Sequence, residues 1–100
     1  MFKLIALYRK PADVESFDKH YFNVHLPLVK AVPGLRKLEI VRVGGAPMGD
    51  SRYHLMAEMT YDSLEAMNAA NASPEGRAVA RDVMSFAADV LTLFYGEVGQ

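Results

Sequence analysis

Two histidines, His20 and His25, and the aromatic residues Tyr21 and Phe22 share one short helical pattern, FDKHYFNVHLPLV, at residues 17–29. Pro27 interrupts this pattern, because proline disfavours the helical conformation at Leu26 and has no N–H to offer the carbonyl of Asn23. We therefore expect the helix to end or kink near His25. Free carbonyl groups at a helix end favour a nearby imidazolium. His25 is thus the first candidate for chemistry.

Two interpretations of His25 remain open from the residues alone. An imidazole titrates near ~6.5, so His25 could donate or accept a proton, or orient a ligand, in a pocket between helices and sheet. Alternatively, it is a structural residue that bonds a carbonyl at the broken helix end. Tyr21 lies one helical turn earlier and shares the same face, so it could orient His25 or bind a substrate oxygen.

Further side chains could complete such a pocket. We predict that it is lined by Tyr8, Tyr53, His54 and Met56, which offer hydroxyls, a second imidazole and an adaptable thioether. His54 opens a predicted strand, so it is either a polar group at the pocket mouth or an ordinary residue at the surface or in a dimer contact. We interpret His20 as solvated. Asp82 could reach His25, but we interpret it as a solvated carboxylate on a helix face.

Several kinds of chemistry are disfavoured. The chain has no cysteine, which excludes disulfides, thiolate nucleophiles and cysteine-type zinc sites. His20 and His25 are five residues apart, whereas ligand pairs on a helix prefer a spacing of four, so we expect no metal site. The glycine-rich stretch at 44–50 precedes no helix and is no phosphate loop. We expect no cofactor.

The composition indicates a single domain over residues 1–100, with a net charge of −1 and 51% hydrophobic residues. Lysine and arginine are dispersed, so we expect no nucleic-acid partner. No apolar segment approaches the length of a membrane span, and the first residues lack the pattern of a signal peptide. We therefore expect a cytoplasmic protein with no membrane partner.

Hydrophobic periodicity predicts strands at 2–9, 36–43, 53–60 and 90–98. Helices are expected from Asp13 to about His25, from about Ser63, and from Ser73 to about Ala87, with good capping residues at each start. The order β-α-β-β-α-β predicts an α+β, ferredoxin-like fold with a four-stranded antiparallel sheet and helices on one face.

Alternation along the predicted strands places apolar residues on both faces of that sheet. An antiparallel sheet with one solvated face should have polar residues there. The helices can cover only one face, so we predict that a second copy of the chain covers the other. The expected assembly is a homodimer through the sheet faces.

Four short motifs resemble the EthD family, named for ethyl tert-butyl ether degradation. They are YFNVHLPL at residues 21–28, PGL at 33–35, Tyr53-His54, and SPEG at 73–76. The resemblance implies a dimeric α+β barrel in which His25 points toward a cavity. Related barrels include cofactor-free monooxygenases, lactone isomerases and cyclases or dehydratases. It therefore implies acid/base or oxygenase-type chemistry on a hydrophobic, oxygen-bearing small molecule, or a non-catalytic protein that binds such a molecule in a degradation or biosynthetic pathway.

Overall fold

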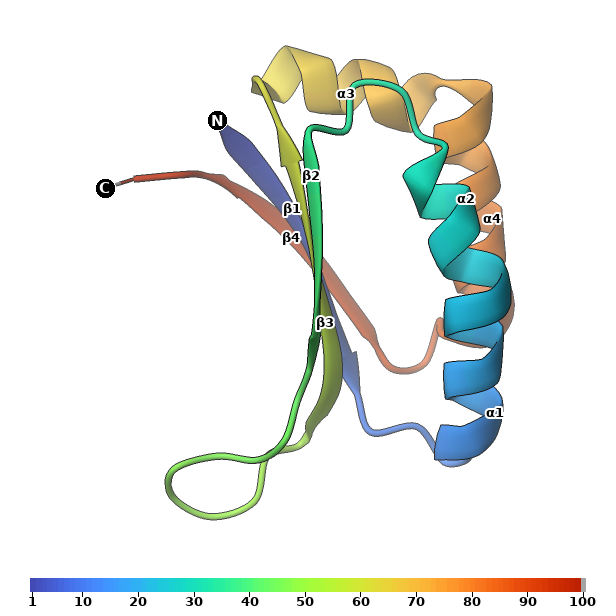
Figure 1. Ribbon diagram of the computed structural model, residues 1–100, viewed down its shortest axis with the longest axis vertical. Helices are drawn as coiled ribbons and strands as arrows, with labels where there is room; N and C mark the ends of the chain where they lie inside the picture. The colour runs from blue at the N-terminus through green and yellow to red at the C-terminus, as the bar shows by residue number, and fades with distance from the viewer. Residues whose placement is uncertain (100) are drawn as a thin grey trace.

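The computed structural model describes residues 1–99 as one sheet with helices packed against one of its faces (Figure 1). The strands are β1 (Phe2–Arg9), β2 (Lys37–Arg42), β3 (Tyr53–Tyr61) and β4 (Leu91–Glu97). The helical segments are α1 (Val14–His20), a π-helical turn η1 (Tyr21–His25), α2 (Leu26–Lys30), α3 (Leu64–Ala72) and α4 (Pro74–Phe86). The predicted elements are all present, and their ends differ by one or two residues except at the first helix, which continues past His25 to Lys30.

The strand order is β2-β3-β1-β4, and every neighbouring pair is antiparallel. The two central strands, β1 and β3, pair with each other, and helical connections lead from β1 to β2 and from β3 to β4, which is the ferredoxin-like arrangement. The α+β class and the four-stranded antiparallel sheet predicted from the sequence are confirmed.

Local capping explains where three helices begin. The side chain of Asp13 accepts a hydrogen bond from the Ser16 N–H before α1. Ser63 caps α3, and Ser73 caps α4 by accepting from the Gly76 N–H at 3.0 Å. Each oxygen satisfies one of the free N–H groups in the first helical turn, as the sequence predicts.

The helix does not end or kink at His25 as predicted. It continues from α1 through η1 into α2 (Figure 1). In η1 the N–H of Leu26 bonds to the carbonyl of Tyr21, five residues earlier. This wider turn accommodates the ring of Pro27, which lies at the start of α2, where a missing N–H is tolerated. The carbonyl groups of a helix end therefore do not surround His25.

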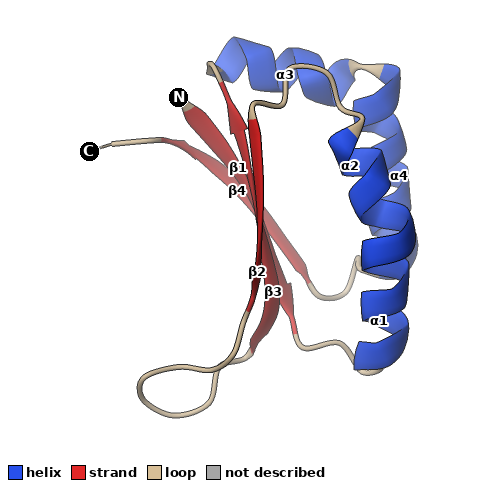
Figure 2. Ribbon diagram, in the orientation of Figure 1, coloured by secondary structure: helices blue, strands red, loops and turns tan. Residues whose placement is uncertain are grey.

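All helices lie on one face of the sheet (Figure 2). The helix-facing side chains of the central strands are buried. From the strand register, the opposite face carries both apolar and charged residues: Ile5, Leu7, Val41, Met56 and Phe94, beside Lys3, Glu39 and Glu58. Lys3 and Glu58 form an ion pair at 3.2 Å. The prediction of an apolar second face is therefore only partly correct, because a charged row crosses it.

The α3–α4 corner depends on close backbone contact. A Cβ atom at Gly76 would lie 2.1 Å from the carbonyl oxygen of Ala70, well inside any real contact. Glycine at this position lets the start of α4 pack directly on the end of α3. The corner places α4 along the sheet, where it forms one wall of the site described below.

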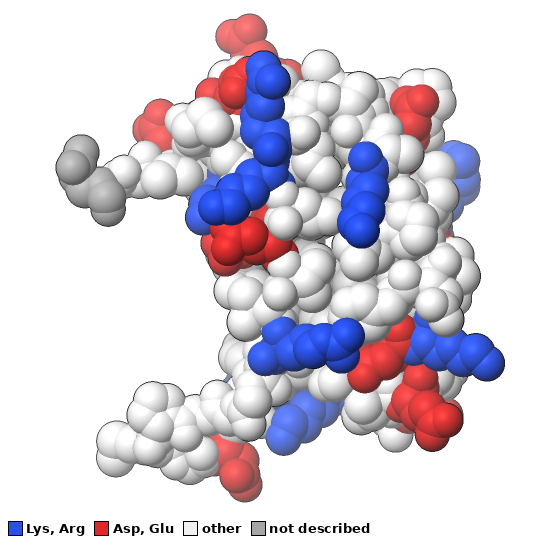
Figure 3. All heavy atoms as spheres, in the orientation of Figure 1, with Lys and Arg blue, Asp and Glu red and all other residues white. Residues whose placement is uncertain are grey.

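Charged side chains are interspersed on the molecular face shown in Figure 3, where Lys and Arg alternate with Asp and Glu and form no continuous basic surface. Within residues 1–99, each helix is too short or too polar to cross a lipid bilayer.

Candidate functional site

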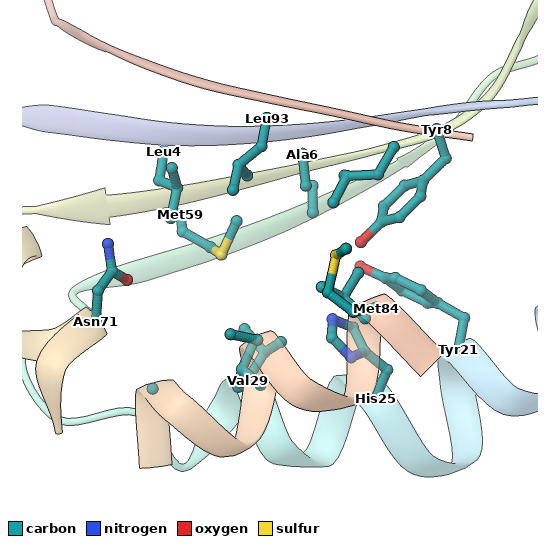
Figure 4. Close-up of a pocket in the computed structure, with 16 residues that line it drawn as sticks. Leu4, Ala6, Tyr8, Tyr21, His25, Val29, Met59, Asn71, Met84 and Leu93 are labelled. Atoms are coloured by element: carbon teal, nitrogen blue, oxygen red, sulfur yellow. The ribbon is translucent and has the colours of Figure 1, made fainter. Parts of the chain in front are cut away.

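A cavity of about 330 Å³ lies between the helix-facing side of the sheet and α4 (Figure 4). Most of its lining is apolar and comes from β1, β3, β4, α2 and α4. These residues are Leu4, Ala6, Val29, Ala57, Met59, Val79, Ala80, Val83, Met84, Leu91 and Leu93. Its volume falls at the lower end of the range of about 300–1,000 Å³ found for small-molecule pockets.

The entrance of the cavity lies between α4 and the edge strand β4. Met84 and Leu93 line the cavity, yet 62% and 54% of their surfaces are exposed. Ala80, also exposed, lies one turn before Met84 on α4. Apolar side chains at an open rim allow a hydrophobic molecule to enter without desolvating charged groups.

Asn71 on α3 lies at one end of the cavity, and three other polar side chains gather at the opposite end (Figure 4). Tyr8 from β1, Tyr21 and His25 from η1 all line it, and each is at most 3% exposed. The rings of Tyr8 and Tyr21 meet edge to face with centroids 5.6 Å apart, and the centroids of Tyr21 and His25 are 5.4 Å apart. Figure 4 shows both tyrosine hydroxyls above the ring of His25.

Asp82 from α4 fixes the ring of His25. The Nδ1 atom of His25 lies 2.9 Å from Oδ2 of Asp82. A carboxylate oxygen accepts, so Nδ1 carries the proton and Nε2 of the neutral ring keeps a free lone pair. The contact thus selects one tautomer and leaves a proton acceptor on the edge of the ring that does not face Asp82.

His20 binds the same carboxylate. Its Nε2 lies 3.0 Å from Oδ1 of Asp82, and its ring packs on Phe86 with a centroid distance of 4.3 Å. The Asp82 side chain is only 14% exposed and that of His20 is 32% exposed. The interpretation of Asp82 as solvated is therefore wrong, and that of His20 is only partly correct. Asp82 joins a buried imidazole to one that reaches the surface.

Burial lowers the pKa of His25 below its ordinary value of 6.5, because the charged form loses solvation. The hydrogen bond and charge of Asp82 act in the opposite direction, and His20 adds a small lowering effect. The net direction is downward. His25 is therefore a neutral base at neutral pH, with a partner placed to stabilise the imidazolium when it accepts a proton.

The structure brings together three of the predicted site residues: Tyr8, Tyr21 and His25. The other three do not line the cavity. Met56 pairs with Leu7 on the opposite face of the sheet. Tyr53 pairs with Arg9 at the end of β3. Their predicted places in a pocket with His25 are therefore not supported.

His54 lies outside the cavity for a different reason. A β-bulge between the pairs Tyr8–Leu55 and Arg9–Tyr53 leaves His54 as the extra residue, which disturbs the alternation of side chains. Its Nε2 lies 2.6 Å from Oδ1 of Asp18 on α1, and its ring meets that of Phe17 edge to face. His54 thus ties the start of β3 to α1.

Asp82 is the site residue that the sequence interpretation missed. Its partner His25 is 57 residues away along the chain, so no local motif links them. A signal was nevertheless present: Val79, Val83 and Phe86 form the packed stripe of α4, and Asp82 falls within it at helical spacing. A carboxylate inside an apolar stripe requires a buried partner.

Residues 1–99 contain no group of three or more His, Cys, Asp or Glu side chains arranged to hold a metal ion. The two imidazoles at Asp82 are both satisfied by its carboxylate. The arrangement is that of a hydrogen-bonded base rather than of a metal ligand set.

Comparison with known proteins places the chain in a family. The EthD domain matches residues 9–89, which run from the end of β1 through α4 and include Tyr21, His25 and Asp82. The chain belongs to the EthD family. An uncharacterized 11.0 kDa protein encoded in the thcB-thcC intergenic region of Rhodococcus erythropolis is 30% identical over 95 residues, covering 95% of this chain and 92% of that protein.

Solved structures agree with the EthD assignment. An EthD family protein from Bacillus halodurans is 48% identical and superposes with a TM-score of 0.96, covering 99% of each chain. A dimeric ferredoxin-like protein of unknown function from Thermobifida fusca is 18% identical, with a TM-score of 0.72 over 97% of this chain and 90% of that one. The second likeness concerns the fold alone.

Proposed function

We propose that the protein binds a small, hydrophobic, oxygen-bearing molecule in the cavity beside α4, and that His25 exchanges a proton with it without a cofactor. The observation that carries this proposal is the burial of the His25 ring and its hydrogen bond to Asp82. The ring is buried beside an apolar cavity, and Asp82 holds its Nδ1 atom at 2.9 Å. A base whose pKa is lowered by burial, so that it is uncharged at neutral pH, and whose tautomer is fixed can accept a proton in general acid–base catalysis.

In this proposal Asp82 is a positioning residue. It orients the imidazole and stabilises the imidazolium that forms when Nε2 takes a proton. His20 holds the other oxygen of the carboxylate and reaches the surface. The second imidazole therefore helps to hold the Asp82 carboxylate in place beside His25.

We also propose that the chain forms a homodimer through the sheet face that carries no helices. The apolar residues Ile5, Leu7 and Met56 on this face are only partly buried within one chain, and Val41 and Phe94 are 40% and 48% exposed. A second copy would cover them. The ion pair of Lys3 and Glu58 would then lie in the dimer contact, so we expect an interface with both apolar and charged residues.

Binding can be tested with small aromatic molecules that carry oxygen, such as acetophenone and 2-phenylethanol. ¹H–¹⁵N NMR should show shifts at Val29, Ala57 and Val83 and at the His25 ring, but not at His54. Ala80→Trp should block the entrance and abolish these shifts. Ala69→Trp is the matched control, because Ala69 is exposed on α3 and does not line the cavity.

Two results would contradict the binding proposal: no shifts at millimolar ligand, or equal shifts in both tryptophan variants. Binding that survives in His25→Gln, with no proton exchange detected in the bound ligand, would favour the non-catalytic alternative.

A further inference from the structure

Two phenol side chains converge at the polar end of the cavity from different elements. Tyr8 comes from the central strand β1 and Tyr21 from the π-helical turn η1, and each residue is 1% exposed. Their rings are held edge to face at 5.6 Å, and Phe17 packs against both at 5.4 and 6.0 Å. Figure 4 shows the two hydroxyl oxygens turned toward each other inside the cavity.

Neither hydroxyl has a hydrogen-bond partner within residues 1–99. The side-chain hydrogen bonds near the cavity involve His20, His25 and Asp82. Every fully enclosed side-chain oxygen or nitrogen in the described part of the chain is paired, so these two oxygens must border the open cavity. Both hydroxyls are therefore free to donate into the cavity, and an oxygen of a ligand placed between the two would accept a hydrogen bond from each.

Both phenols remain hydrogen-bond donors under all ordinary conditions. Burial raises the pKa of Tyr8 and of Tyr21 far above the usual value, because the phenolate would lose its solvation. The neighbouring Tyr21 and Asp82 raise the pKa of Tyr8 further. Two neutral O–H donors in a site of low polarity form the type of arrangement that stabilises a developing negative charge on oxygen.

We propose that Tyr8 and Tyr21 together form an oxyanion-binding site, and that the ligand class is a hydrophobic carbonyl compound with an acidic C–H next to the carbonyl. This inference deepens the proposed function and rests on it. The carbonyl oxygen lies between the two hydroxyls, and the adjacent carbon faces Nε2 of His25, whose ring centroid is 5.4 Å from that of Tyr21.

The reaction is enolisation, and it needs no oxidant or co-reactant. The lone pair on Nε2 of His25 takes the proton from the carbon. The electrons of the broken C–H bond form a C=C bond, and the electrons of the C=O π bond move to the oxygen, where the two O–H groups donate to it. Return of the proton from the imidazolium to the same carbon restores the substrate. If a further C=C bond is conjugated with the enolate, return of the proton to the far carbon of that system yields an isomer.

The probe for this site is 4-nitrophenol, whose anion resembles an enolate in shape and charge and absorbs at longer wavelength than the neutral molecule. Its match is 4-nitrotoluene, which has a methyl group in place of the hydroxyl. Mixed with the wild-type protein at a pH where the free dye is neutral, bound 4-nitrophenol should show the phenolate spectrum, because its proton passes to His25. 4-Nitrotoluene should also bind, but it has no hydroxyl proton to pass to His25 and should show no such change in its spectrum.

Tyr8→Phe and Tyr21→Phe each remove one donor and keep the ring. Each should weaken binding of 4-nitrophenolate by roughly 10- to 100-fold, the effect of losing a hydrogen bond to a charged group, while binding of 4-nitrotoluene stays unchanged. Tyr61→Phe is the control: Tyr61 is 2% exposed on the same face of the sheet but does not line the cavity. It should bind both probes as the wild type does.

The outcomes separate the two proposals. If both probes bind, but 4-nitrophenol stays neutral and both cavity variants bind it normally, the paired-donor site is overturned and the binding cavity stands. If neither probe binds, the proposed function fails and the inference fails with it. Should a Tyr→Phe variant not fold, the spectrum of the dye bound to the wild-type protein decides, because a neutral spectrum is sufficient to overturn the inference.

Discussion

At the scale of single residues, one carboxylate organises the site. Asp82 accepts hydrogen bonds from His25 and His20, which lie on consecutive turns of one helical segment. Burying a carboxylate is unfavourable unless its oxygens are paired, and here each oxygen meets an imidazole. The same contacts that make this charge tolerable also fix the tautomer of the buried base. In the proposed function, stability and reactivity are therefore coupled through Asp82.

The lowered pKa of His25 predicts how stability depends on pH. Above pH 6.5, the pKa of the ring in the unfolded chain, His25 is neutral in both the folded and the unfolded protein. Its contribution to the free energy of unfolding is then fully present. As pH falls from there through the lower folded pKa, the unfolded chain binds a proton first and stability decreases. Chemical denaturation of the wild type down to about pH 5 should show this loss, and His25→Gln should show a smaller one.

The groups that face His25 are Asp82 and His20 from the neighbouring helices, Tyr21 from its own turn and Tyr8 from the sheet. His54→Gln serves as the control, because His54 pairs with Asp18 outside the cavity. This variant should keep the change of unfolding free energy with pH that depends on His25. Identical pH profiles for the wild type and His25→Gln would contradict the assignment of a depressed pKa.

Sequence reasoning identified His25 and Tyr21 because both lie on one helical face next to an unusual proline. It placed Tyr8 in the pocket because a tyrosine can offer a hydroxyl to a ligand. It could not connect Asp82 to His25, because that contact depends on how α4 packs across α1 and η1. It also misplaced His54, since a β-bulge shifts the alternation and leaves no clear signal in the residues around it.

At the scale of elements, two irregular features shape the cavity. The π-helical turn carries the helix past Pro27 and keeps Tyr21 and His25 buried together. Such turns are rare and frequently occur at functional sites. The α3–α4 corner sets the course of α4, which supplies both Asp82 and the wall of the cavity. Neither feature follows from propensity, because each depends on local geometry that a hydrophobic pattern does not encode.

Gly76→Ala tests the corner. The added Cβ would meet the backbone of Ala70 and Asn71, which cannot rotate away, so α4 must move relative to α3. We expect a loss of about 1–3 kcal/mol in the free energy of unfolding, typical of overpacking, measured by urea denaturation. Gly44→Ala is the matched control, because nothing lies within 4 Å of its added Cβ. An unchanged midpoint in Gly76→Ala would refute the proposed role of this contact.

At the scale of the whole molecule, the sheet separates two functions. One face holds the core and the cavity, and the other holds the proposed dimer contact. Adjacent residues of the edge strand β4 belong to different faces: Leu93 pairs with Ala6 on the cavity side, and Phe94 pairs with Ile5 on the open side. The sequence predicted the sheet and its alternation correctly, yet it overestimated how apolar the open face is, because Lys3, Glu39 and Glu58 share it.

A pair of variants on β4 tests this division. Phe94→Lys places a charge in the proposed contact, so light scattering should show a shift from twice the chain mass toward 11.1 kDa. Leu93→Lys, one residue away, places the same charge at the cavity entrance, where the side chain is 54% exposed. It should leave the dimer intact and weaken binding of 4-nitrotoluene. A wild-type monomer at micromolar concentration, or dissociation by both variants alike, would exclude the proposed interface.

The entrance residue Met84 makes the cavity sensitive to oxidation. Its thioether is 62% exposed, whereas Met59 on the cavity wall is 7% exposed. Peroxide should therefore convert Met84, together with the exposed Met48, to the sulfoxide before Met59, and mass spectrometry of the treated protein can show the order. A sulfoxide is polar and chiral, and methionine sulfoxide reductases can reverse it. The redox state of one side chain at the rim would then determine how easily an apolar molecule reaches the buried base.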